Sequence, residues 1–257
     1  MDVRTLFVLV CGLVCGAAPA QQHAPLPKPI SGPRVVGIGF NGPISAGDVD
    51  RLRSAIALAG EEPLPARIVV FFDSGGGDGL AAMQIGRLLR HAKAHVFVTR
   101  RCASACVFAF AGGVYRSALP GTLGVHRARL TTTRDGKVVD VDLADSPAAS
   151  QFFSDAEAQI ALHLDEMGVS PALFAEMQTV PPRSMRWLTA EEAAGFGLTG
   201  FDPGYLRERG AALQTRYGIP EAEVPVRTAN VIERCGEAVT RHSAFIACYR
   251  QQLLATP

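Results

Sequence analysis

Apolar runs alternate with amphipathic stretches through the first half of the chain. Residues 34–40, 66–72 and 95–99 predict strands, and the unbroken apolar run at 66–72 is typical of a strand that is covered on both faces. Residues 46–58 and 80–91 predict the helices between these strands, and the first of them has an apolar stripe at helical spacing. Strands and helices in alternation predict a parallel sheet with crossover helices, so we expect the α/β class.

The pattern changes in the second half of the chain. Residues 103–111 (ASACVFAFA) predict a small buried helix, and a short strand is expected at 122–127. The polar stretch 131–145 contains an Asp-Gly turn signal and predicts an exposed hairpin or flap. A long helix is expected at 148–167, and residues 230–254 are predicted to be mostly helical.

The first residues have the features of an export signal. Arg4 supplies a charged start, residues 5–14 are nearly all apolar, and small residues precede a cleavage position after Ala20. An uncleaved anchor is the alternative interpretation of residues 1–20. Residues 21–33 contain four prolines and predict an extended leader. We therefore expect a periplasmic or secreted protein.

Composition and charge narrow the function. The chain has 257 residues, of which 48% are hydrophobic, and this excludes a wholly disordered protein. Lys and Arg number 25 against 24 Asp and Glu, so the net charge of +1 argues against a nucleic-acid partner. The organisation that we expect is a domain at 34–205 and a helical C-terminal extension at 206–257.

Four cysteines remain after the signal peptide: Cys102, Cys106, Cys235 and Cys248. An even number in an oxidising compartment predicts two disulfides, and three pairings are possible. We favour Cys235 with Cys248, closing a helical hairpin, which leaves Cys102 with Cys106. A spacing of four is awkward for a disulfide inside a regular helix, but a turn that enters a helix allows it. A zinc site is the rival interpretation, without a Cys-x-x-Cys pair or clustered histidines to support it, so no metal is expected.

Three features carry candidate chemistry: a Gly75-Gly76-Gly77 turn after a buried strand, Ser104 before a helix, and His126 in a later strand. Each has an ordinary interpretation when taken alone. A serine before a helix usually caps it, and a single histidine in a strand is more often a paired core residue than a base. The signal lies in their combination and order.

The runs FFDSGGGDGLAAMQIGRLL, RRCASACVFAFAGG and LGVHR together resemble the proteolytic subunit of Clp protease, in the crotonase superfamily. The resemblance covers residues 34–202 and implies a spiral of ββα units, to which the residues themselves add the helical extension at 206–257. It also implies a serine peptidase with Ser104 as nucleophile, His126 as general base, and the N–H groups of Gly77 and Ala105 as the oxyanion hole. An imidazole must take the hydroxyl proton, because serine is a poor nucleophile near neutral pH.

The resemblance also has implications for partners. We expect no cofactor and no ATPase partner, because a periplasmic protein has no ready supply of ATP. The expected substrate is then a short peptide or an unfolded polypeptide. Family members assemble into rings, so the resemblance implies a homo-oligomer. A crotonase acting on coenzyme A thioesters conflicts with export.

One family residue is missing. Met185 stands where the family has its acidic third residue, and the neighbouring Trp187 is expected to be a core anchor. Asp165 is our first choice for a replacement, with Glu166 and Glu176 as alternatives. A Ser-His dyad and an inactive site both stay open. The second hypothesis is therefore a non-catalytic periplasmic binding or scaffold protein on the same fold.

Overall fold

The computed structural model describes residues 35–60, 67–202, 205–206, 218–238 and 241–254. The predicted signal peptide (1–20) and leader (21–33) lie outside the described residues. Within the described part of the chain, no helix is long and apolar enough to cross a membrane.

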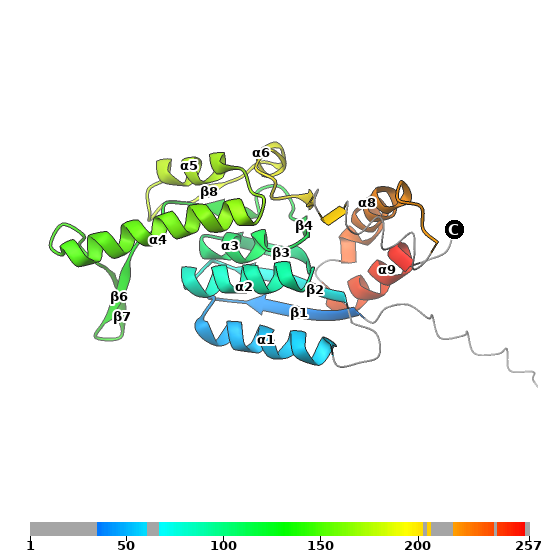
Figure 1. The fold of residues 1–257 in the computed structure, drawn as a ribbon, viewed down its shortest axis with the longest axis horizontal. Coiled ribbons are helices and arrows are strands. Elements are labelled where there is room, and N and C mark those ends of the chain that lie inside the picture. Colours follow the sequence, from blue (N-terminus) through cyan, green and yellow to red (C-terminus); the bar gives the residue numbers. More distant parts are fainter. Residues whose placement is uncertain (1–34, 61–66, 203–204, 207–217, 239–240, 255–257) are drawn as a thin grey trace, which may run out of the picture. The chain divides into compact units, whose positions relative to one another are not determined.

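A mixed sheet forms the centre of the fold (Figure 1). Its first four strands run parallel and lie side by side: β1 (Val35–Asn41), β2 (Arg67–Ser74), β3 (His95–Ala103) and β4 (Tyr115–Ser117). A short antiparallel strand, β9 (Gly200–Phe201), closes the β4 edge. The helical connections between the parallel strands confirm the predicted α/β class.

Strand β3 pairs with a different neighbour at each of its ends. Its first three residues pair with β4, and its last two, Cys102 and Ala103, pair with β5 (Leu123–Val125). A two-residue strand, β8 (Arg186–Trp187), adds antiparallel to β5. The sheet therefore branches at the carboxyl end of β3. The apolar pattern predicts a strand only to residue 99, because the following residues include the exposed Arg100 and Arg101.

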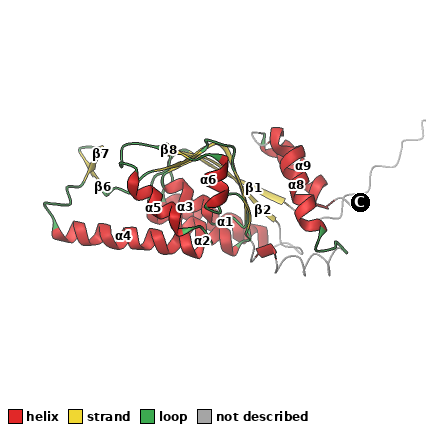
Figure 2. Ribbon diagram, turned by 90° about the horizontal axis from the view of Figure 1, so that it is seen from above, coloured by secondary structure: helices red, strands yellow, loops and turns green. Residues whose placement is uncertain are grey.

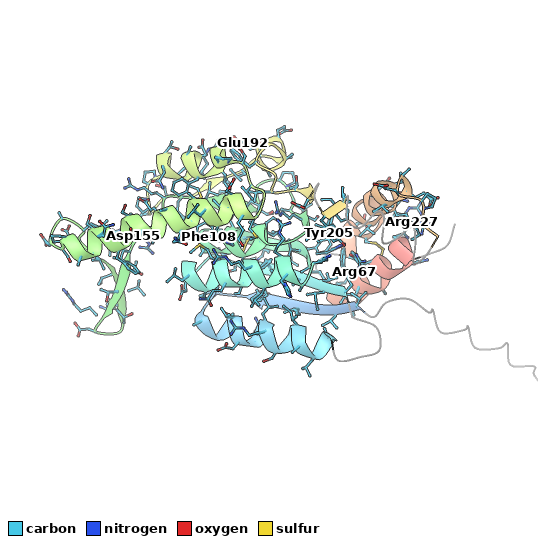
Figure 3. All side chains as sticks on the ribbon, in the orientation of Figure 1. Arg67, Phe108, Asp155, Glu192, Tyr205 and Arg227 are labelled. Carbon is cyan, nitrogen blue, oxygen red and sulfur yellow. A yellow bond between two sulfur atoms is a disulfide. The ribbon has the colours of Figure 1, made fainter. Side chains whose placement is uncertain are left out.

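Helices cover one face of the sheet. They are α1 (Ala46–Gly60), α2 (Gly79–His91), α3 (Ala105–Ala111), α4 (Pro147–Glu166), α5 (Pro171–Thr179) and α6 (Ala190–Gly195). Val70 and Phe72 of β2 point into this layer, where they join the larger hydrophobic core. His163 of α4 donates its Nε2 hydrogen to the carbonyl oxygen of Phe108 on α3 (2.9 Å; Phe108 is labelled in Figure 3). The predicted small helix is thus fully buried between its neighbours.

The opposite face is covered by the C-terminal helices α8 (Glu223–Cys235) and α9 (His242–Leu254), with the short 3-10 helix η1 (Gly236–Ala238) between them. Figure 2 shows these helices and α1 on different sides of the strands. Val69 and Phe71 alternate with the residues of the other face and pack against Phe245 and Tyr249. Both faces of β2 are covered, as its apolar run predicts.

The predicted exposed hairpin is confirmed as β6 (Thr131–Arg134) and β7 (Lys137–Asp140). Asp135 and Gly136 form its turn with φ of 51° and 72°, as expected for a two-residue turn of type I′. Its base is tied down by Asp140, which pairs with Arg129 (2.9 Å) and Arg183 (2.7 Å).

One core prediction is wrong. Trp187 is 43% exposed, because the two-residue strand β8 lies at the edge of the sheet, where its partner β5 leaves one side open. The aromatic residues of the predicted buried helix, Phe108 and Phe110, are at most 4% exposed.

Candidate active site

Ser104 occupies a strained turn between β3 and α3. Its N–H donates to the carbonyl oxygen of Gly124 (2.9 Å), and its own carbonyl accepts from the N–H of Val107 (3.0 Å). Its backbone angles are φ 58° and ψ −130°, a conformation that costs a non-glycine residue about 1–3 kcal/mol. Strain of this kind gathers at functional sites, so the conformation of Ser104 makes it a candidate for chemistry.

The hydroxyl of Ser104 is not used to cap its helix. Ser146 and Ser170 also precede helices, and each accepts a hydrogen bond from a backbone N–H of its first turn, at 3.2 Å and 3.3 Å. Ser104 makes no such bond. The ordinary interpretation of a serine at this position therefore does not hold, and the hydroxyl is left available for another role.

His126 comes directly after β5, and its ring orientation is fixed by the backbone. Its Nδ1 lies 2.7 Å from the carbonyl oxygen of Arg127. A carbonyl can only accept, so Nδ1 carries the hydrogen and Nε2 keeps its lone pair. The side chain is 9% exposed. A general base needs this tautomer, because it leaves the lone pair of Nε2 free to accept a proton.

The register of the sheet brings Ser104 and His126 to the same edge. Ala103 pairs with Gly124 in parallel strands, and the chain continues from these residues into Ser104 and Val125-His126. The carboxyl ends of adjacent parallel strands point the same way, so both side chains leave the sheet at its carboxyl edge. No direct hydrogen bond joins the hydroxyl of Ser104 to the imidazole in this structure. In unliganded enzymes such contacts are often long and tighten when substrate binds.

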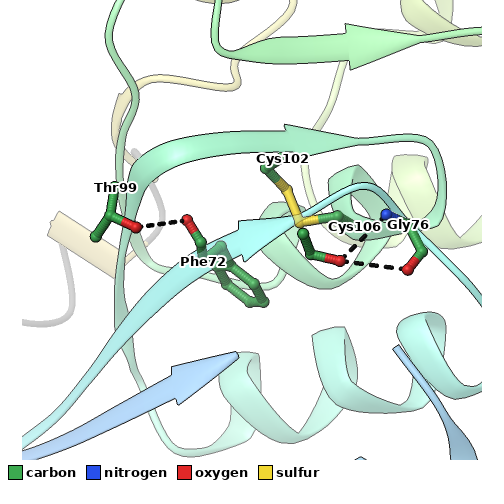
Figure 4. The surroundings of a disulfide bond; sticks show 6 residues. Phe72, Gly76, Thr99, Cys102 and Cys106 are labelled. Carbon is green, nitrogen blue, oxygen red and sulfur yellow. Dashed lines mark hydrogen bonds between the residues drawn. A yellow bond between two sulfur atoms is a disulfide. The ribbon is translucent and has the colours of Figure 1, made fainter. Parts of the chain in front are cut away.

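The glycine-rich turn after β2 lies against Ser104. A methyl group added to Gly76 would lie 2.7 Å from Cβ and 3.1 Å from Oγ of Ser104, so only glycine fits there. The buried Ser74 fixes the turn, because its Oγ accepts from the N–H of Gly76 (3.1 Å) and donates to the carbonyl of the same residue (3.3 Å; Figure 4). Sequence reasoning missed Ser74, which carries no motif of its own.

The backbone of Ile44 holds the segment around Gly77 in place. The N–H of Ile44 donates to the carbonyl oxygen of Gly76 (2.8 Å), and the N–H of Asp78 donates to the carbonyl oxygen of Ile44 (2.9 Å). A methyl group added to Gly77 would lie 2.3 Å from the carbonyl oxygen of Ile44, so only glycine fits there as well. Ala105 is the first residue of α3, and its N–H has no partner within the helix. An oxyanion hole formed by Gly77 and Ala105 stays a prediction.

In the described part of the chain, no hydrogen bond or ion pair joins an acidic candidate to His126, so the choice of Asp165 stays a prediction. Asp165 is exposed near the end of α4 and makes no side-chain hydrogen bond to the imidazole. Glu166 pairs with Arg87 (3.0 Å), and Glu176 is equally engaged, with Arg186 (3.1 Å). The carbonyl of Arg127 occupies the Nδ1 position where a triad would have its acid.

Met185 lies beside the strand that leads to His126. A methyl group added to Gly124 would lie 2.7 Å from the sulfur of Met185. Extending the register of β5 and β8 by one residue places Met185 opposite His126. Met185 therefore lies on the chain segment that pairs with β5, and its place as the substitute for the acid stays a prediction. Among the residues that the structure describes, no group of acidic, histidine or cysteine side chains could hold a metal ion.

Both favoured disulfides form. Cys102 and Cys106 are joined across Ser104, with their Cα atoms 5.2 Å apart, and Cys235 and Cys248 join α8 to α9. The first bridge is possible because Cys102 still belongs to β3 and Cys106 is the second residue of α3, so a turn separates them.

No protein-family model matches the chain, and no curated protein matches it by sequence. Among solved structures, it is similar to a mutant of 1510-N, a membrane-bound stomatin-specific protease, with 21% identity and a TM-score of 0.46. That alignment covers 70% of this chain and 86% of the other. The chain is also similar to a mutant of ClpP1 from Listeria monocytogenes, with 18% identity and a TM-score of 0.49, over 63% of this chain and 88% of the other. The α/β class that the sequence predicts is the class that the sheet and its helical connections show.

Proposed function

We propose that this protein is an exported serine hydrolase that cleaves peptide or related acyl bonds without ATP. The observation that carries the proposal is the conformation of Ser104. The backbone of Ser104 is strained, and its hydroxyl makes no capping bond. Ser104 also leaves the sheet at the same edge as His126. A purely structural serine would gain nothing from this conformation.

The proposed reaction uses side chains and backbone groups of this chain alone. The Oγ atom of Ser104 attacks the substrate carbonyl while Nε2 of His126 takes its proton. The hydrogen on Nδ1 stays bonded to the carbonyl of Arg127, which keeps the imidazole oriented and favours the imidazolium as it forms. The N–H groups of Gly77 and Ala105 receive the negative charge on the substrate oxygen.

The second half of the reaction reverses these transfers. The imidazolium of His126 protonates the leaving amine, which departs and leaves an acyl ester on Ser104. A water molecule then gives a proton to Nε2 and attacks the ester. The imidazolium returns that proton to Oγ of Ser104 as the acid leaves, which restores the hydroxyl and the neutral imidazole. Without an unfolding ATPase, the substrate is a short peptide or an already unfolded chain. A homo-oligomer and a periplasmic or secreted location belong to the same proposal.

A fluorophosphonate probe tests the proposal on the purified mature protein. Labelling is expected in the wild type and is lost in Ser104→Ala, since the nucleophile is absent. His126→Ala slows labelling by about 10²–10⁴-fold, because general-base assistance is lost. Ser170→Ala is the matched control, since it removes a serine that does cap its helix, and it labels at the wild-type rate. Labelling that survives Ser104→Ala would contradict the proposal.

A non-catalytic binding or scaffold protein is the second candidate. Met185 in the place of an acid, and the lack of a direct hydrogen bond between Ser104 and His126, favour it. Folded wild-type protein that remains unlabelled, as a monomer and as any oligomer that gel filtration detects, would support this candidate over the hydrolase.

A further inference from the structure

We infer that the disulfide between Cys102 and Cys106 positions Ser104 for reaction. Opening this bridge should lower the rate at which Ser104 reacts, while the fold persists. The inference rests on the proposed function. It assigns to the bridge a role in the site, in addition to any general contribution to stability.

The bridge encloses the reactive turn. Cys102 is the second-last residue of β3 and Cys106 is the second residue of α3, so only residues 103–105 lie between them. Ser104 is the central one of these three. A covalent link with Cα atoms 5.2 Å apart fixes where the strand ends relative to where the helix begins. The backbone angles of the three enclosed residues are restricted accordingly.

The turn needs such a restraint. A serine with positive φ relaxes to negative φ when it is free to do so. Two backbone hydrogen bonds hold Ser104: its N–H donates to Gly124 of β5, and its carbonyl accepts from Val107 of α3. Neither bond involves its side chain. The disulfide adds a restraint that crosses the turn from one side to the other.

The same bridge also borders the glycine-rich turn. Cys102 pairs in register with Ser74, the residue that fixes Gly76 through its hydroxyl (Figure 4). The two turns that would supply the nucleophile and one of the oxyanion donors therefore meet at the disulfide. Both sulfur-bearing residues are fully buried, so the bridge is a fixed part of the site and is not exposed for exchange with large partners.

The second disulfide provides a matched comparison within the same chain. Cys235 and Cys248 are 13 residues apart and join the two helices that cover the other face of the sheet. Cys102 and Cys106 belong to the core of the opposite face. Removing either bridge deletes two sulfur atoms, but only one of the bridges encloses Ser104.

The experiment compares Cys102→Ala/Cys106→Ala with Cys235→Ala/Cys248→Ala. Fluorophosphonate labelling is measured over a range of probe concentrations, so that probe binding and bond formation are separated. The first variant is expected to lose about 10- to 100-fold in bond formation, because small displacements of a reacting group have effects of that size. Binding of the probe changes little. The second variant stays within about twofold of the wild type, since its bridge is distant from the turn.

Reduction of the wild type gives the same test without a substitution. Dithiothreitol donates two electrons and two protons to the disulfide, giving two cysteine thiols and its own cyclic disulfide. Alkylation and mass spectrometry then show which bridge has opened. Labelling should fall when Cys102 and Cys106 become thiols and recover on reoxidation, while the circular dichroism spectrum is retained.

The outcomes separate the inference from the proposed function. If the wild type is labelled and the Cys102→Ala/Cys106→Ala variant is labelled at the same rate, the inference is wrong and the proposed function stands. Loss of the whole fold on reduction overturns it as well, because the bridge would then have a global role. An unlabelled wild type defeats the proposed function. In that case amide hydrogen exchange decides: faster exchange at 103–106 alone in the variant supports the restraint, and unchanged exchange rejects it.

Discussion

Strand β3 begins at His95 and ends just before Ser104, and polar side chains gather at both of its ends. At the amino end, His95 is 1% exposed and bonds to Arg67 and Tyr249. Arg67 donates to Nε2 (3.1 Å), and Nδ1 then carries the hydrogen that bonds the hydroxyl of Tyr249. The ring of Tyr115 packs against the imidazole with 5.4 Å between ring centres.

The carboxyl end is built differently. The hydroxyl of Ser104 makes no capping bond, and His126 uses only one of its two ring nitrogens. A paired polar cluster stabilises the fold, because each partner is satisfied after its removal from water. Polar groups left unpaired in a strained turn do not add stability, but they remain available to a substrate. The comparison teaches that a histidine becomes a candidate for chemistry when a ring nitrogen is unused and a strained serine leaves the sheet at the same edge, and not by its presence alone.

A substitution at the amino end of β3, where the polar groups are paired, should lower the stability of the fold. Tyr249→Phe leaves His95 and Arg67 without their shared partner, and we expect the free energy of unfolding to fall by about 1–3 kcal/mol. Urea denaturation measures this change. Tyr205→Phe is the control in the same cluster, since Tyr205 packs against Phe201 with ring centres 6.0 Å apart (Arg67 and Tyr205 are labelled in Figure 3). An equal loss in both variants would show that the hydroxyl of Tyr249 has no special role.

A third histidine sharpens the comparison through pH. His163 is fully buried, its Nε2 donates to a carbonyl as Nδ1 of His126 does, and its Nδ1 has no partner. Burial lowers the pKa of His163 below its ordinary value of 6.5, Arg87 and Arg90 lower it further, and the carbonyl of Phe108 and the carboxylate of Glu166 oppose the shift.

The sign of the effect follows from the direction of this shift. Below pH 6.5 the unfolded chain binds a proton at His163 that the folded chain does not bind. Stability therefore falls as the pH drops below 6.5, by at most about 1.4 kcal/mol per pH unit, until the lowered pKa of the folded state is reached. His163→Gln keeps a donor for the carbonyl of Phe108 and removes the titration. Urea denaturation at pH 5 and pH 7 should show a smaller difference for this variant, and an unchanged difference would contradict the assignment.

The smallest effect on stability is expected at the carboxyl end of β3, where Ser104 lies. Ser104→Gly relieves the positive φ and should raise the free energy of unfolding by about 1 kcal/mol. Labelling is lost in the same variant. Ser104→Ala is the control, because alanine keeps the strain and removes only the hydroxyl. A thermal melt that shows no gain for glycine over alanine would mean that the turn is not strained.

The sequence was sufficient for much of this molecule. The alternation of apolar runs gave the order of strands and helices, and the burial of β2 on both faces followed from the five consecutive apolar residues at 68–72. Ser104 and His126 became candidates because three motifs occur in one order. Local signals were less reliable at the edges: Trp187 was expected in the core, and the two-residue strands β8 and β9 are too short to show any periodicity.

The sequence by itself therefore determined which segments are strands and helices, which faces they bury, and which side chains are candidates for chemistry, because hydrophobic periodicity is a local property of the chain. Only the tertiary structure decided that the carbonyl of Arg127 fixes the imidazole, that Gly76 is the glycine lying against Ser104, and that a disulfide encloses the turn. Those features depend on contacts between segments far apart in sequence, where the backbone supplies the partner and residue type carries no signal.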